Sequence, residues 1–146
     1  MNNSIFCRGG KTCEGWGLFV LRVVTGIIFA VHGYQKLAGG IEGTGQFLTM
    51  LGVPLASFFA YVVTFVELLG GIALIAGFLT RWASLFLTID MVVALFLVHI
   101  GNGFYISKGG YEYVLILLAA SVTLLMTGAG SCALDSRCGK KEELSA

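Results

Sequence analysis

The chain has 146 residues and a mean hydropathy of +0.90; 57% of the residues are hydrophobic, only 12% are charged, and the formal net charge is +1. About 25% of the residues of an ordinary soluble domain are charged, so a small single domain this apolar could not cover its surface with water-compatible groups, and we expect a lipid bilayer around it. The near-zero net charge and the absence of a basic run exclude nucleic acid as a partner.

Four apolar segments follow one another along the chain, at 16–37, 53–79, 82–99 and 111–127. Each is close to the ~20 residues that a helix needs to cross a ~30 Å hydrocarbon layer, with the last two on the short side. No segment alternates polar and apolar residues over its length, which excludes membrane strands. We therefore predict an all-α fold, a bundle of four transmembrane helices with antiparallel up-down topology.

The connections between these segments carry turn and helix-end signals. A short interfacial helix is expected at 47–52, and Pro54 falls where the second long helix would start, a position that needs no amide donor. The link at 78–82 is so short that the second and third helices should be antiparallel neighbours. A glycine-rich loop at 101–110 precedes the fourth helix, and the glycines at 128–130 end it.

Lysine and arginine placement predicts the orientation of the bundle, because these residues accumulate on the cytoplasmic side of a membrane. With four spans, both termini and the 78–82 link share one side, which holds Arg8, Lys11, Arg81, Arg137, Lys140 and Lys141. The other side holds only Lys36 and Lys108. We therefore expect a cytoplasmic tail at 1–15, a membrane domain at 16–130 and a second cytoplasmic tail at 131–146.

Several titratable side chains fall at similar heights in the outer half of the predicted bundle. At a rise of about 1.5 Å per residue, His32 and His99 each lie ~25 Å, and Glu67 ~18 Å, above the cytoplasmic ends of their helices. Such groups within spans usually face the bundle interior and pair there. We predict a polar pocket, with a glutamate as the counter-ion of the lysine, formed by His32, Lys36, Glu67, His99 and Glu112. A purely structural ion pair that fixes helix order is the alternative.

A deeper pair is also expected. Arg22 and Asp90 lie ~10 Å and ~12 Å above the cytoplasmic ends of their helices, so they are predicted to form a structural ion pair across the bundle. Small residues repeat on the same helices and permit close backbone approach. They form one stripe with Gly26 and Gly33 on the first helix and another on the second, which holds Glu67, Gly70, Gly71, Leu74 and Gly77.

The four cysteines, Cys7, Cys13, Cys132 and Cys138, all lie in the predicted tails. Three interpretations are open: reduced, solvent-facing thiols, a redox-active dithiol, or a metal site. Structural zinc pairs usually have two to four intervening residues, whereas these pairs have five and Cys-x-x-Cys is absent, so no metal site is predicted. A disulfide would be expected if the orientation were reversed.

Six features in a fixed order resemble the DoxX family of small membrane proteins. They are Arg22 with Gly26; HGYQKL at 32–37; FLTMLGVP at 47–54; the glycine-containing stretch from Glu67 to Arg81; a third helix that ends in His99 and is followed by GGYEY at 109–113; and GAGSCALD at 128–135. The resemblance covers about 16–135. It implies a multi-pass protein of a bacterial or archaeal cytoplasmic membrane, from a family named after the small subunit of a thiosulfate:quinone oxidoreductase. Matching the family pattern selects Arg22, Gly33, Lys36, Glu67, Gly71, Gly77, Arg81, His99 and Glu112, and identifies none as catalytic.

Two functional hypotheses follow. In the first, the chain is a subunit or accessory of a quinone-linked membrane oxidoreductase, with the polar pocket bonding to a quinone carbonyl and exchanging protons. The sequence has no motif for haem, flavin or an iron–sulfur cluster, so electrons would come from a membrane or cytoplasmic partner protein. In the second, it is a non-enzymatic membrane scaffold or small-ligand carrier. Both hypotheses allow the protein to form a homo-oligomer.

Overall fold

The computed structural model describes residues 10–135, with side chains from residue 15 onward, and all regular structure in this part of the chain is helical. Three helices are long and apolar enough to cross a membrane: Gly15–Ala38, Ala56–Ala76 and Thr80–Asn102; Glu112–Thr127 is apolar but shorter. In chain order the elements are α1 (Gly10–Ala38), α2 (Ile41–Met50), α3 (Ala56–Ala76), α4 (Thr80–Ala94), η1 (Leu95–His99), η2 (Ile100–Asn102), η3 (Ile106–Lys108) and α5 (Glu112–Thr127).

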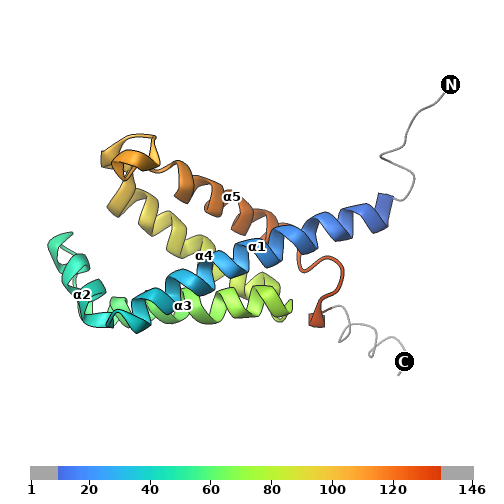
Figure 1. The fold of residues 1–146 in the computed structure, drawn as a ribbon, viewed down its shortest axis with the longest axis horizontal. Helices are drawn as coiled ribbons and strands as arrows, with labels where there is room; N and C mark the ends of the chain where they lie inside the picture. The colour runs from blue at the N-terminus through green and yellow to red at the C-terminus, as the bar shows by residue number, and fades with distance from the viewer. Residues whose placement is uncertain (1–9, 136–146) are drawn as a thin grey trace.

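The long helices form two packed pairs. Helix α1 lies along α3, α4 packs against α5, and the short helix α2 rests on α3 near the end of α1 (Figure 1). The start of α1, the α3–α4 link and the end of α5 lie towards the same end of the molecule, with the first turns of α1 projecting beyond the others, and α2 and the α4–α5 connection lie at the opposite end (Figure 1). The expected short α3–α4 link is confirmed, with Gly77 in the left-handed conformation that ends α3.

Helices α1 and α3 touch through their backbones. A Cβ atom on Gly71 would lie 2.4 Å from the Ala30 nitrogen and 2.6 Å from the Gly26 carbonyl oxygen, and one on Gly33 would lie 2.4 Å from the Leu68 nitrogen. Only glycine leaves room for such an approach, which is how helices pack closely in lipid without a hydrophobic driving force. Gly26, Gly33 and Gly71 of the predicted stripes therefore form the α1–α3 interface, whereas Gly70 faces Leu87 of α4.

The apolar interior is thin and the outside is apolar as well. Phe29, Leu74, Leu87 and Leu124 are fully buried between the helices. Large hydrophobic side chains such as Val24, Phe65 and Phe86 are half exposed on the outer surfaces of the same helices. A water-soluble protein would hide such residues, whereas hydrocarbon solvates them, so the structure fits a bilayer.

Two elements differ from the sequence-based prediction. Helix α2 begins at Ile41, several residues before the expected start, because Gly45 packs on α3 with its Cβ position 3.7 Å from the Ser57 Cα atom, and this contact outweighs the weak helix propensity of the glycines. Helix α3 begins at Ala56, because Leu55 adopts a left-handed φ of 52°. Pro54 therefore precedes the helix and does not occupy its first turn.

The third apolar segment changes its winding before it ends. Helix α4 stops at Ala94 and continues as the π-helix η1 and then the 3-10 turn η2. A π-helical turn is a frequent mark of a functional site, because it redirects side chains relative to an α-helix. The π-helix contains His99, one of the residues of the predicted pocket.

The segment after α5 folds back against the bundle. The Ser131 amide donates to the Gly15 carbonyl at 3.2 Å, and the Asp135 amide donates to the Gly77 carbonyl at 2.9 Å. The Asp135 carboxylate accepts the amides of Leu79 at 2.8 Å and Thr80 at 2.9 Å, and so caps the start of α4. Part of the predicted C-terminal tail is thus attached to the membrane domain.

Candidate functional site

A cavity of about 310 Å³ lies between the two helix pairs, beside α2 and the α4–α5 connection. Its walls are mainly apolar, with Phe29, Val63 and Leu117 among the lining side chains. Its charged and imidazole side chains come from four elements: His32 and Lys36 from α1, Glu67 from α3, Asp90 from α4 and His99 from η1. Such a cavity, apolar with a few convergent polar groups, is typical of small-molecule sites.

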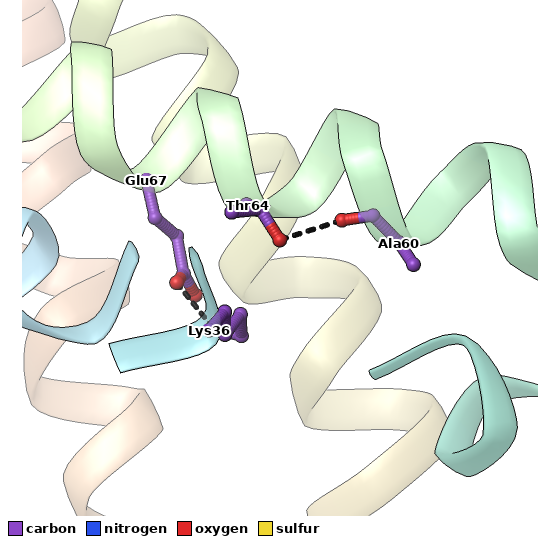
Figure 2. Close-up of polar contacts among 4 residues, drawn as sticks. All are labelled: Lys36, Ala60, Thr64 and Glu67. Carbon is purple, nitrogen blue, oxygen red and sulfur yellow. Dashed lines mark hydrogen bonds and ion pairs between the residues drawn. The ribbon is translucent and has the colours of Figure 1, made fainter. Parts of the chain in front are cut away.

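Lys36 and Glu67 form an ion pair across the α1–α3 interface (Figure 2). The Glu67 side chain is 7% exposed and the Lys36 side chain 27% exposed. The glycine contact at Gly33 holds the α1 backbone against Leu68, the neighbour of Glu67, and thereby brings the two charged side chains together. The predicted glutamate counter-ion of Lys36 is Glu67.

Thr64 lies one turn before Glu67 on the same face of α3 and is fully buried (Figure 2). Its hydroxyl donates to the Ala60 carbonyl at 2.7 Å, within its own helix. Because Thr64 satisfies its donor locally, the Glu67 carboxylate is left to Lys36 and to the remaining groups of the cavity wall.

Asp90 belongs to the same cluster, which the sequence analysis did not predict. Its carboxyl lines the same cavity as Glu67 and Lys36 and interacts electrostatically with both. Its Oδ2 atom is buried and meets no hydrogen-bond donor in the described part of the chain. The sequence does contain a sign of this role: an aspartate in the middle of an apolar helix needs a buried partner.

The predicted Arg22–Asp90 pair is corrected by the structure, because Arg22 lies in a different cluster. Arg22 is fully buried, and its Nη2 atom donates to the Cys132 carbonyl at 3.0 Å. A Cβ atom on Gly77 would lie only 1.7 Å from the Arg22 Nη1 atom, so Arg22 is level with the α3–α4 link. Asp90 lies ten residues beyond Thr80, about 15 Å further along α4. The hydrogen-bond acceptor of Arg22 is therefore the Cys132 carbonyl, in the segment after α5.

The two histidines line the cavity from different elements, His32 from α1 and His99 from η1. The His32 ring lies 6.2 Å from the Tyr113 ring, centroid to centroid. The His99 Nδ1 atom forms a 2.7 Å hydrogen bond with the Gly109 carbonyl oxygen; a carbonyl only accepts, so Nδ1 carries the hydrogen and Nε2 is the free position in the neutral ring. A neutral His99 therefore presents an acceptor, and a protonated one a donor.

Glu112, the fifth residue of the predicted pocket, does not line the cavity. Its Oε1 atom accepts the Ile106 amide at 2.6 Å, which ties the start of α5 to the loop at 101–110. The structure therefore brings together four of the predicted pocket residues, adds Asp90, and places Glu112 in a loop-stabilising contact beside them.

The cysteine predictions are only partly within the described residues. Cys132 is a free, exposed cysteine. Cys7 and Cys138, like the Cys13 side chain, lie outside the described part. Among the residues that are described, no three histidine, cysteine or acidic side chains gather in a way that could hold a metal ion.

Comparison with known proteins gives the relationship of the chain. Residues 17–100 match the DoxX family. The chain is 40% identical to the "Putative oxidoreductase CatD" of Bacillus subtilis over 82% of its own length and 84% of that protein. It is 30% identical to the "Inner membrane protein YqjF" of Escherichia coli over 90% of its length and 98% of that protein, and 32% identical to an "Uncharacterized membrane protein" of Mycobacterium tuberculosis over 83% and 80%.

No solved structure matches the chain significantly. The family match covers more than half of the chain, and the Bacillus subtilis and Escherichia coli relatives are matched over 84% and 98% of their own length. Together with the apolar helices, these matches identify a multi-pass membrane protein. The chain therefore belongs to the DoxX family.

Proposed function

We propose that the protein is a subunit or accessory of a quinone-linked membrane oxidoreductase complex and that its cavity binds the quinone headgroup. The observation that carries this proposal is the convergence of an ion pair, a further carboxyl and two histidines on one otherwise apolar cavity. The name of the Bacillus subtilis relative, a putative oxidoreductase, supports a redox role.

The cavity fits the two chemical parts of a quinone. A quinone offers carbonyl oxygens that accept hydrogen bonds and, when reduced by two electrons, takes up two protons. Lys36 and a protonated His32 or His99 can donate to such oxygens, and the apolar walls can contact the ring. The buried Asp90 Oδ2 atom, which meets no donor in the described residues, is an acceptor for a hydroxyl of the reduced ligand. Electrons reach the site from a partner protein.

We further propose that both termini are cytoplasmic, which places the cavity in the outer half of the bilayer. The support is the excess of lysine and arginine in the sequence at and before the start of α1, around the α3–α4 link and after α5. Modification of Cys132 by an impermeant thiol reagent in opened but not in intact cells is the expected result. Labelling of Cys132 in intact cells, in a variant that keeps only this cysteine, would reverse the orientation.

A second candidate function is a non-catalytic scaffold or small-ligand carrier. The observation that favours it is the position of the Lys36–Glu67 pair directly beside the backbone contact of Gly33 with Leu68, where an ion pair can fix the register of α1 against α3. In that case the charges stabilise the bundle and no ligand is required.

Purification in mild detergent, followed by mass spectrometry of bound small molecules, separates the two candidates. A quinone that copurifies with the wild-type protein and is lost in H32A supports the first. The matched control is Q35A, since Gln35 is exposed on the same helix and does not line the cavity. An empty wild-type protein that E67Q destabilises supports the scaffold. Unchanged quinone-dependent turnover of the native complex in both H32A and E67Q would reject the pocket role.

A further inference from the structure

Glu67 on α3 and Asp90 on α4 bring two carboxyl groups from packed helices to the wall of one cavity. Glu67 is paired with Lys36, and the Oδ2 atom of Asp90 is buried without a hydrogen-bond donor among the described residues. Two ionised carboxylates have only acceptor atoms, so a hydrogen bond between them forms only when one of them carries a proton. One proton, bound to either carboxyl, would therefore supply the donor for a hydrogen bond between these side chains.

The charge balance of the cluster with neutral histidines favours the same hydrogen. With both carboxyls ionised, Lys36, Glu67 and Asp90 together carry one uncompensated negative charge between apolar helices. An unpaired charge in such surroundings is strongly unfavourable, and two adjacent carboxyls avoid it by sharing a proton. One bound proton makes the cluster neutral and gives the Asp90 Oδ2 region the donor that it otherwise lacks.

We propose that Glu67 and Asp90 form a proton-binding site that holds one exchangeable proton in the wall of the cavity, with Lys36 as the fixed positive charge. The site goes beyond the proposed quinone pocket, because it binds a proton from water whether or not a ligand is present. Asp90 supplies the second carboxyl, and without it the Lys36–Glu67 pair is already neutral and binds no further proton.

The surroundings contain few other groups that exchange protons. The titratable side chains that face the cavity are His32 and Lys36 on α1, Glu67 on α3, Asp90 on α4, His99 on η1 and Tyr113 on α5. Helix α2 contributes only Thr44, Phe47 and Leu48. Imidazole and phenol groups have no carboxylic carbonyl, so a protonated carboxyl can be told apart from them by its vibrational spectrum.

Infrared spectroscopy of the full chain in lipid vesicles, titrated with pH in H₂O and in D₂O, tests the proposal. The wild-type protein is expected to show at neutral pH the carbonyl stretch of a protonated carboxylic acid, shifted by deuterium exchange. D90N is expected to lose this band and D90E to keep it. The matched control is D135N, which removes the chain's other aspartate outside the cavity and should leave the band unchanged.

Three results would overturn the proposal: no protonated carboxyl in the wild-type protein at neutral pH, persistence of the band in folded D90N, or its loss in D135N. The wild-type spectrum needs no variant, so it refutes the proposal even if a substitution prevents folding. If D90N does not fold, E67Q takes its place and is expected to remove the same band. Because no quinone is added, failure here would leave the proposed quinone function standing, and failure to find quinone would leave this site standing.

Discussion

Substitution of Gly71 by alanine tests how the α1–α3 interface creates the site. The new methyl group would meet the Ala30 nitrogen at 2.4 Å and the Gly26 carbonyl oxygen at 2.6 Å, where ordinary contacts are 3.4–4 Å. All of these atoms are backbone, so none can rotate away, and the helices must separate by about 1 Å. We expect G71A to lower the free energy of unfolding by about 3 kcal/mol, in the upper part of the usual range for overpacking.

The assay is unfolding by increasing SDS in mixed detergent micelles, monitored by circular dichroism. G17A is the matched control, because Gly17 lies on α1 with nothing within 4 Å of its Cβ position. Replacement of an unhindered helical glycine by alanine stabilises a helix by roughly 0.5–1 kcal/mol, so G17A should be no less stable than the wild type. A G71A protein as stable as G17A would refute the close backbone contact and, with it, the reason given for the position of the Lys36–Glu67 pair.

Two further substitutions probe the charged contacts. E67Q removes the carboxylate that is paired with Lys36 and leaves only the Asp90 carboxyl to balance the ammonium, so it should lower the free energy of unfolding by roughly 2–4 kcal/mol. The double variant K36M/E67L should recover most of this loss, since an apolar pair can replace a buried ion pair. Equal loss in both variants would contradict the account. D135A removes the acceptor of the Leu79 and Thr80 amides and should lower the free energy of unfolding by about 1 kcal/mol in the same SDS assay. D135N keeps one side-chain oxygen and should lose less. A D135A protein as stable as the wild type would show that the cap does not stabilise α4.

Much of the membrane domain could be predicted from the sequence, because helix length and hydropathy are set locally. The apolar segments, the α3–α4 link, the glycine end of α5 and the small-residue interface all follow from residue type and spacing. Four of the five predicted pocket residues line the cavity for a related reason: in lipid, a titratable side chain must turn inward, and the height of a residue along its helix follows from the rise per residue.

The partners of Arg22 and Asp90 could not be obtained in this way. The height of a residue along its helix does not say in which direction its side chain points. The helices also start at different levels: α1 begins at Gly10, so Arg22 lies level with Gly77 at the end of α3 and below Asp90. The acceptor for Arg22 comes from Cys132, in a segment that the sequence had assigned to a tail.

The early start of α2 and the π-helical turn depend on tertiary contacts. Gly45 becomes helical because it packs on α3, in spite of its low propensity. The π-helix widens the winding between Leu95 and His99, and no residue pattern in that apolar run distinguishes it from an ordinary α-helix.

Equilibrium binding of a short-chain quinone to the purified protein tests the central claim, that the cavity between the helix pairs is a ligand site. V63W fills the cavity from α3, and V62W is the matched control because Val62 is exposed and does not line the cavity. We predict saturable binding by the wild type and V62W and its loss in V63W, measured by isothermal titration calorimetry in detergent. Equal binding by V63W and V62W, or no saturable binding by the wild type, would contradict the account.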